Sequence, residues 1–174
     1  EADEATKRKA LLDAQTDCFE AGLTMVCDAG LDVGTIELIR TMRANGAYTC
    51  LVSGGFTLFT TRVAELIGFQ ENRANELLVE DSKLTGKVAE PILGREAKLA
   101  TLVDLRESFD IDNLDTMVVG DGANDLAMIE QAGAGVAYHA KPAVAAAAGM
   151  RIDHGDLTAL LYIQGYKRSE FVTS

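Results

Sequence analysis

The sequence predicts an α/β fold, in which a parallel β-sheet has helices on both faces and a small β-hairpin is added. The first observation behind this prediction is that segments with helical spacing of apolar residues alternate with short apolar runs. The second is that these runs, four or five residues long, are apolar throughout, which is typical of buried parallel strands. The third is that 174 residues, 48% hydrophobic and 25% charged, suffice for one domain with its own core.

Residues that start or stop regular structure mark the bounds of each predicted element. Thr35–Ala44, for example, carries apolar residues on one side and ends before Asn45-Gly46. The predicted helices are Thr35–Ala44, Thr57–Ile67, Arg95–Phe109, Asn124–Gln131, Pro142–Ala148 and Leu157–Ile163. The predicted parallel strands, expected to be neighbours in one sheet that allows one inserted strand, are Tyr48–Val52, Thr116–Val119 and Gly135–Tyr138. Glu76–Val79 and Leu84–Val88 flank a polar stretch, which predicts an antiparallel hairpin away from the centre of the sheet.

The charge of the chain argues against nucleic acids and membrane surfaces as partners. Sixteen Lys and Arg residues against 27 Asp and Glu residues give a net charge of −11, which repels phosphate backbones and anionic lipid. No run approaches the roughly 20 apolar residues of a membrane span, and no signal-peptide pattern opens the sequence. Cys18, Cys27 and Cys50 lack metal-ligand spacing, so we expect reduced thiols in a cytoplasmic protein.

A serine and two glycines, Ser53-Gly54-Gly55, follow the predicted strand Tyr48–Val52. Ligands of open parallel sheets bind at the carboxyl ends of the strands. Small residues at the start of a helix favour an anion there, because backbone N–H groups point outward and the helix dipole is positive. The alternative interpretation is an ordinary tight turn in which Ser53 caps the helix.

Two acids, Asp121 and Asp125, follow the predicted strand Thr116–Val119 within the sequence Gly-Asp-Gly-Ala-Asn-Asp. One lies at the end of the strand and the other in the first turn of the next helix, so both converge on the same edge. Carboxylate oxygens are hard donors that suit Mg²⁺. The alternative is a helix-capping cluster, since Asp and Asn are favoured where helices begin.

Lys98 lies in the first turns of the helix Arg95–Phe109, where the helix dipole disfavours a cation. By itself it is most simply explained as a solvated surface lysine. Together with the serine turn and the two carboxylates, however, it indicates phosphoryl chemistry. Carboxylates would hold Mg²⁺, the lysine would neutralise a phosphate, and the turn would cradle it.

These residues resemble the motifs of the haloacid dehalogenase superfamily. LVSGGF (51–56), Lys98 within REAKLATL, and VVGDGANDLAM (118–128) are similar to its second, third and fourth motifs. The resemblance extends to the hairpin segment 74–88 and to parts of residues 140–166, and covers roughly Leu31 to Phe171. Within the superfamily, these segments are similar to those of a phosphomonoester hydrolase.

The resemblance implies a Rossmann-like domain, Mg²⁺ as cofactor, a small phosphorylated metabolite as substrate and an aspartyl-phosphate intermediate. It further implies that Ser53-Gly54 binds the phosphate and that Lys98 pairs with it. Asp121 would ligate Mg²⁺, Asp125 would support the metal site, and Asn124 would contact the substrate. Residues 31–174 would then be the phosphatase core, preceded by an unassigned segment, 1–30.

The first motif of the family, a strand followed by Asp-x-Asp, is missing or degenerate. Only 52 residues precede Ser53, and they contain no Asp-x-Asp. Gln15 would stand at the nucleophile position of a degenerate motif, but glutamine cannot form an acyl phosphate. Asp28 is the better candidate nucleophile, because the apolar run Leu23–Cys27 precedes it, although Gly30 stands where the general acid/base belongs. The third interpretation is that residues 1–30 are a helix or a cap remnant and that the motif is absent.

The first-motif strand of the family lies between the strands of motifs two and four. Its loss would leave two buried strand edges unpaired, so we expect a strand from this chain or another to take its place, with Leu23–Cys27 as candidate. The predicted function is a Mg²⁺-dependent phosphomonoester hydrolase whose activity is impaired in this chain. The alternative is a non-catalytic relative that binds phosphate or Mg²⁺, or a scaffold module.

Overall fold

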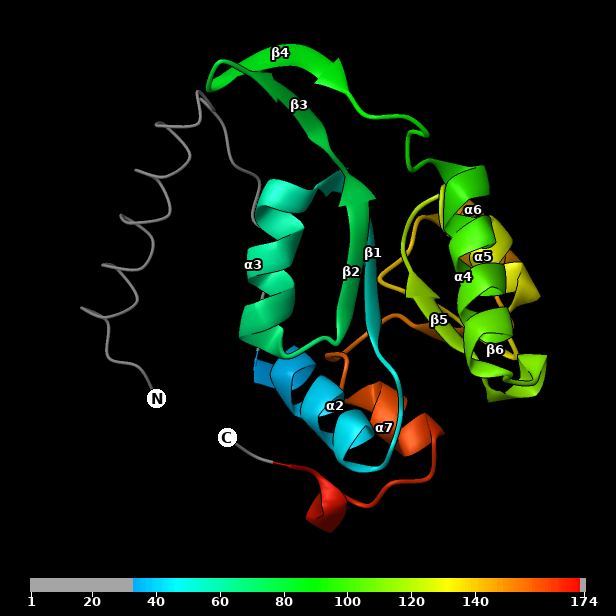
Figure 1. Ribbon diagram of the computed structural model, residues 1–174. Helices are drawn as coiled ribbons and strands as arrows, with labels where there is room; N and C mark the ends of the chain where they lie inside the picture. Colours follow the sequence, from blue (N-terminus) through cyan, green and yellow to red (C-terminus); the bar gives the residue numbers. More distant parts are fainter. Residues whose placement is uncertain (1–32, 173–174) are drawn as a thin grey trace.

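Helices alternate with strands along residues 33–172, the part of the chain that the computed structural model describes (Figure 1). The helices are α2 (Val33–Ala44), α3 (Thr57–Ile67), α4 (Arg95–Phe109), α5 (Leu126–Gln131), α6 (Pro142–Ala147) and α7 (Ala159–Ile163), with short 3₁₀ turns η1 (Asn113–Asp115) and η2 (Arg168–Glu170). The strands are β1 (Cys50–Phe56), β2 (Glu71–Asn75), β3 (Leu77–Glu80), β4 (Lys83–Val88), β5 (Met117–Gly120), β6 (Ala134–Tyr138) and β7 (Met150–Ile152).

Two hydrophobic clusters, one on each face of the strands, form the core. Val136 of β6 belongs to the same cluster as Leu38 of α2, and the next residue, Ala137, belongs to the cluster of Leu102 in α4. Because neighbouring residues of a strand point to opposite faces, α2, α3 and α7 cover one face and α4, α5 and α6 cover the other. The predicted helices on both faces of a parallel sheet are thus confirmed.

The described strands form three hydrogen-bonded sets. β1 and β2 are parallel, β5, β6 and β7 are parallel in that order, and β3 and β4 form an antiparallel hairpin. Figure 1 shows this hairpin extending beyond the ends of β1 and β2, away from the other strands. The hairpin and its position therefore match the prediction.

The pairing order within residues 33–172 is interrupted between β1 and β5. β1 pairs only with β2 there, and β5 only with β6, so each has one edge without a described partner strand. The prediction that the parallel strands are neighbours is confirmed for β5 and β6, whereas β1 and β5 do not pair directly. The candidate for the inserted strand, Leu23–Cys27, lies outside the described residues, as does the whole segment 1–30.

Two strands of the structure were not predicted. β2 reads Glu-Asn-Arg-Ala-Asn, so no apolar run marks it, and β7 is only three residues long. β2 is extended because it pairs with β1, with Cys50 opposite Glu71, and not because of its own pattern. In contrast, α3 and α4 have the predicted bounds. Gly68 ends α3 with a left-handed φ of 100°.

A polar network attaches β2 to α4. The Arg73 guanidinium of β2 lies 2.6 Å from the Asp104 carboxylate of α4 and also binds Glu71, which accepts a hydrogen bond from the Tyr48 hydroxyl. Partial burial would raise the pKa of Glu71, but the hydrogen bonds from Tyr48 and Arg73 outweigh it and lower this pKa below the usual 4.5. Tyr48 also packs on Phe109, the last residue of α4, with ring centroids 4.3 Å apart.

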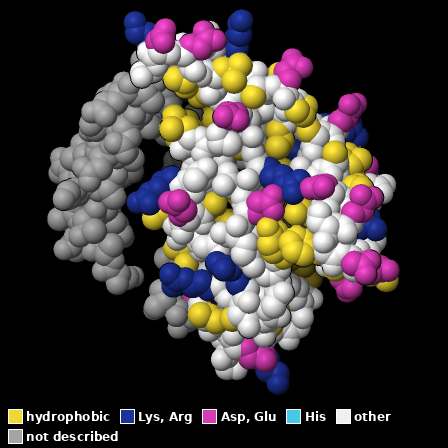
Figure 2. Space-filling model, in the orientation of Figure 1, with side chains coloured by type: hydrophobic (Ala, Val, Ile, Leu, Met, Phe, Trp, Pro, Cys, Tyr) yellow, Lys and Arg dark blue, Asp and Glu magenta, His cyan; other side chains and the backbone are white. Residues whose placement is uncertain are grey.

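The charged side chains of both signs are mixed on the part of the surface that can be seen in Figure 2. None of the helices within residues 33–172 is long and apolar enough to cross a membrane. Cys50 is a free thiol whose pKa is raised to about 11, chiefly by burial; Cys18 and Cys27 lie outside the described residues.

Candidate active site

The serine turn is an irregularity inside β1 and not a helix cap. Val52 lies opposite Arg73 and Phe56 opposite Asn75, so residues 53–55 face a single residue of β2 and are displaced from the ladder. The cap position of α3 is Phe56, and no side chain caps this helix. The capping interpretation of Ser53 is therefore wrong.

The Ser53 hydroxyl is oriented within its own turn. Its Oγ accepts a hydrogen bond from the Gly55 N–H at 3.0 Å, which leaves the hydroxyl proton available for another acceptor. Gly54 and Gly55 are exposed, so a ligand can approach their backbone. The turn can thus offer one hydroxyl donor and the backbone to an anion.

Lys98 is buried, and the interpretation as a solvated surface lysine is wrong. The residue is only 4% exposed, and its Nζ lies 2.6 Å from Oδ1 of Asp125. A buried ammonium near the N-terminus of a helix is unfavourable unless a partner compensates it, and Asp125 supplies that compensation. The pair holds the first turns of α4 against the turn that precedes α5.

Asp125 binds back into its own turn and does not cap α5. Its Oδ2 accepts a hydrogen bond from the Gly122 N–H at 3.1 Å, while its side chain forms no cap bond to α5. Gly120 is required for this fold-back, because a Cβ there would lie 2.5 Å from the Asp125 Cβ. The capping interpretation of the acids thus fails for Asp125.

Asp121 lies at the carboxyl end of β5, with an exposed side chain that has no hydrogen bond or ion pair among residues 33–172. Asn124 is exposed in the same turn. Mg²⁺ in proteins takes one or two carboxylates and completes its octahedron with water and phosphate oxygens, so this pair of acids fits the ion. Asp121 is free to bind directly, whereas both oxygens of Asp125 are already engaged by protein donors.

The described part of the chain offers no third His, Cys, Asp or Glu ligand at this site. No group of three His, Cys, Asp or Glu side chains within residues 33–172 is close enough to hold a metal ion. The candidate nucleophile Asp28, which would add a carboxylate, lies outside the described residues. Among the described residues, the candidate carboxylate ligands for a metal ion at this site are therefore Asp121 and Asp125.

Side-chain hydrogen bonds attach the aspartate turn to the first turns of α4 and the serine turn to the loop directly before α4. Asn75, at the end of β2, donates from Nδ2 to the Gly54 carbonyl at 2.9 Å and accepts at Oδ1 from the Leu93 N–H at 2.6 Å. Five residues beyond Leu93, Lys98 reaches Asp125. The serine turn and the aspartate turn therefore lie at the same end of α4.

Asn75 is the residue that sequence reasoning missed. It belongs to the polar strand β2 and has no motif around it, yet it is only 7% exposed and both ends of its amide are hydrogen-bonded. The only available signal was an asparagine directly before the predicted hairpin. Asparagine is common near turns, so its position there did not indicate a role in the site.

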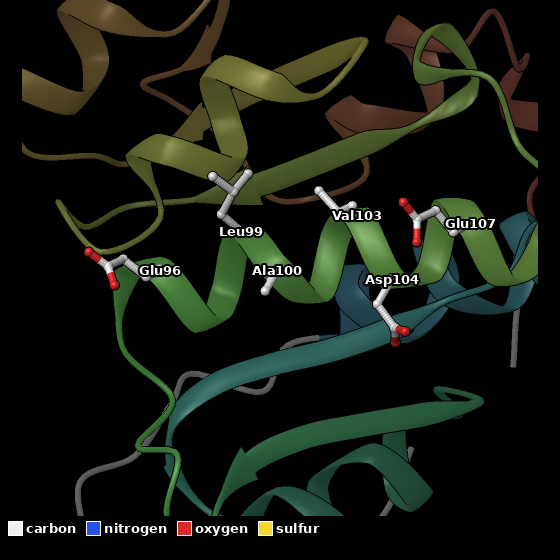
Figure 3. Close-up of a pocket in the computed structure, with 6 residues that line it drawn as sticks. All are labelled: Glu96, Leu99, Ala100, Val103, Asp104 and Glu107. Atoms are coloured by element: carbon white, nitrogen blue, oxygen red, sulfur yellow. The ribbon is translucent and has the colours of Figure 1, made fainter.

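The cavity whose lining residues Figure 3 labels lies along α4, and no residue of the two turns lines it. It has a volume of about 440 Å³ and is lined by Glu96, Leu99, Ala100, Val103, Asp104 and Glu107. Figure 3 shows Leu99 and Val103 pointing to one side of the helix and Asp104 to the other. Three acids and no cation line it, so it does not suit a phosphate.

The family model of the haloacid dehalogenase-like hydrolases matches residues 2–130 of the chain. The match covers well over half of the sequence and includes the serine turn, Lys98 and the aspartate turn. The chain therefore belongs to the haloacid dehalogenase-like hydrolases.

Within that class, the chain is similar to phosphoserine phosphatases. It is 42% identical over 128 residues to the phosphoserine phosphatase of Haemophilus influenzae, and 39% identical over 140 residues to that of Streptomyces coelicolor. These alignments cover 74% and 80% of the chain, but only 41% and 34% of the two relatives. The chain thus spans less than half the length of either protein.

Solved structures of the class have the same fold. A substrate-bound phosphoserine phosphatase complex matches with a TM-score of 0.69 and 36% identity, over 74% of this chain and 61% of that one. A haloacid dehalogenase family hydrolase from Salmonella enterica serovar Typhi matches with a TM-score of 0.72 and 32% identity, over 88% and 50% of the two chains. The predicted fold class is confirmed by these neighbours.

Proposed function

We propose that the chain is the core of a Mg²⁺-dependent hydrolase that acts on phosphoserine, in the route to L-serine. The observation that carries the proposal is that Asn75 attaches the Ser53 turn to Leu93, two residues before α4, while Lys98 in the first turns of α4 binds Asp125. A phosphate between them would meet hydroxyl and backbone donors on one side and an ammonium on the other, as phosphoryl transfer requires. The names of the relatives support phosphoserine as the substrate.

In this proposal the phosphate is bound by neutral donors and one cation. The Ser53 hydroxyl and the backbone of Gly54 donate hydrogen bonds to the phosphate oxygens. The Lys98 ammonium, which binds Asp125, also donates to the phosphate. Asn124, exposed beside the aspartate turn, contacts the substrate. Bringing the ester between these groups positions phosphorus before any bond changes, which is a large part of the catalytic effect.

Asp121 and Asp125 are the proposed metal residues. Asp121 would hold Mg²⁺ directly, and Asp125 would support the site while it keeps Lys98 and the Gly122 N–H in place. Bound Mg²⁺ would supply positive charge to the phosphate oxygens as charge develops on them.

The proposed nucleophile is Asp28, directly after Leu23–Cys27, which we propose as the strand between β1 and β5. The Asp28 carboxylate would attack phosphorus, the bond from phosphorus to the seryl oxygen would break, and water would then hydrolyse the acyl phosphate. The leaving alkoxide needs a proton, and Gly30 cannot supply one. Turnover should therefore be far slower than in a relative with both acids.

This strand assignment has its own test. If Leu23–Cys27 lies between β1 and β5, nuclear Overhauser contacts should connect its backbone with residues 50–52 on one side and 117–120 on the other. Contacts typical of a helix through residues 12–26 would show that the strand assignment is wrong.

The alternative function is a non-catalytic protein that binds phosphate with Mg²⁺. The observation in its favour is that, among residues 33–172, no third acid accompanies the two of the aspartate turn. Phosphate or vanadate binding without any turnover would support this alternative.

Phosphoserine hydrolysis with and without Mg²⁺ separates the two. We expect slow, Mg²⁺-dependent release of phosphate that Asp28→Asn abolishes and that Asp115→Asn, an exposed acid at the opposite end of β5, leaves unchanged. Turnover that is indifferent to Asp28, and also to Asp17, the acid two residues after Gln15, would show that the nucleophile assignment in the N-terminal segment is wrong. Fast turnover that Asp28→Asn abolishes would identify Asp28 as the nucleophile and contradict the prediction that the activity of this chain is impaired.

A further inference from the structure

Asn75 occupies an unusual position for a polar side chain. It is 7% exposed, and its amide connects two backbone segments that are far apart in sequence, the serine turn and the loop before α4. Its Nδ2 donates to the Gly54 carbonyl and its Oδ1 accepts from the Leu93 N–H. A buried amide with both ends satisfied is a specific orienting element, because the loss of either partner would leave a polar group without a hydrogen bond.

The peptide that Asn75 binds, between Gly54 and Gly55, is also held at its other end. The carbonyl oxygen of Gly54 accepts from Asn75 at 2.9 Å, and the N–H of Gly55 donates to Ser53 Oγ at 3.0 Å. The C=O and N–H of a trans peptide point in opposite directions, so fixing the carbonyl fixes the direction of the N–H. Two consecutive glycines would otherwise leave this peptide plane free to rotate.

The orientation of the Ser53 hydroxyl depends on that N–H. While Gly55 donates to Ser53 Oγ, one lone pair of the hydroxyl is occupied and its proton is directed elsewhere. If the peptide rotated, the hydroxyl could turn its proton toward the freed carbonyl of Gly54 and would no longer present it to a ligand.

We propose that Asn75 is a positioning residue that fixes the Gly54–Gly55 peptide and thereby directs the Ser53 hydroxyl proton toward the bound phosphate. This inference rests on the proposed function of the serine turn as a phosphate site. Asn75 itself does not touch the phosphate; it acts through one peptide and one hydroxyl.

Asn72 is a matched control in the same strand. Its Oδ1 accepts a hydrogen bond from the buried Thr60 hydroxyl of α3 at 2.8 Å, so it also connects β2 with another element, but not with the turn. Asn72→Ala and Asn75→Ala each remove one asparagine amide from β2 without a change of charge. A merely structural role of Asn75 would make the two variants alike.

Two measurements on the full chain test the proposal. The first is calorimetric binding of inorganic phosphate in the presence of Mg²⁺, where Asn75→Ala should weaken binding about tenfold and Asn72→Ala less than twofold. In the Ser53→Ala background, Asn75→Ala should weaken binding by less than twofold, because its effect acts through that hydroxyl. The second is amide hydrogen exchange of Gly55 without any ligand, which should be about tenfold faster in Asn75→Ala and unchanged in Asn72→Ala.

The outcomes separate this inference from the proposed function. If the wild-type chain binds phosphate and Asn75→Ala binds it equally well, the positioning role is overturned and the phosphate site stands. If the wild-type chain binds no phosphate, the proposed function fails, and the amide exchange of Gly55 alone tests the role of Asn75. An exchange rate of Gly55 that is the same in Asn75→Ala as in the wild type would then overturn the positioning role. Should Asn75→Ala not fold, Asn75→Asp keeps the bond from Leu93 and loses the donor to Gly54, and the same exchange experiment applies without an anion.

Discussion

At the scale of single residues, burial decides between interpretations that the sequence leaves equal. Lys98 reads as a surface lysine from its helix, but it is buried and paired with Asp125, 27 positions away. Ser53 reads as a helix cap, but it accepts a bond from within its own turn. The first outcome depends on a contact distant in sequence, which local patterns do not contain, and the second on the irregular pairing of β1 with β2.

The Lys98–Asp125 pair leads to a stability prediction. Lys98→Met leaves the Asp125 carboxylate without its cation in a largely buried place, so the free energy of unfolding in urea should fall by about 3 kcal/mol. Lys98→Met combined with Asp125→Asn should be less destabilised than the sum of the two single variants. Strict additivity of the two changes would mean that the pair does not couple in solution.

Some residues of the candidate site were within reach of the sequence and others were not. Ser53, Lys98, Asp121 and Asp125 could be chosen because each lies in a recognisable motif at the end of a strand or the start of a helix. Asn75 could not, since its importance arises from two backbone groups that only the folded chain brings to it.

At the scale of elements, helices were easier to predict than strands. α3 and α4 carry their own stop signals and have the predicted bounds. β2 is polar and owes its extended form to pairing with β1, so its pattern gave no indication of it. The helix expected from Asn124 begins only at Leu126, after a turn in which the Asp125 side chain accepts a hydrogen bond from the Gly122 N–H.

The attachment of β2 to α4 predicts a dependence of stability on pH. The pKa of Glu71 is lowered in the folded state from its usual 4.5, so its contribution is present above pH 4.5 and is lost as pH falls through the folded value. The free energy of unfolding should therefore fall less steeply between pH 5 and 3 in Glu71→Gln than in the wild type. Glu65→Gln, which removes an exposed acid of α3, should keep the wild-type slope. Equal slopes for wild type and Glu71→Gln would contradict the role of the network.

At the scale of the whole molecule, the proposed phosphate site has binding groups among the described residues but no nucleophile among them. Asn75 links the serine turn to the loop before α4, and Lys98 links the first turns of α4 to the aspartate turn, while β1 and β5 each keep one edge without a described partner strand. The chain also spans less than half the length of its relatives from Haemophilus influenzae and Streptomyces coelicolor. A strand that carries a carboxylate into the position between β1 and β5 would supply both missing features at once.

The most direct test of the central claim, that the two turns form one Mg²⁺-assisted phosphate site, is calorimetry of inorganic phosphate binding with and without Mg²⁺. We expect Mg²⁺ to tighten phosphate binding in the wild-type chain and in Asp115→Asn, and to have no such effect in Asp121→Asn. Lower affinity of Lys98→Met for phosphate, with or without Mg²⁺, would accompany that result. Phosphate binding that Mg²⁺ tightens equally in the wild type and in Asp121→Asn would contradict the account.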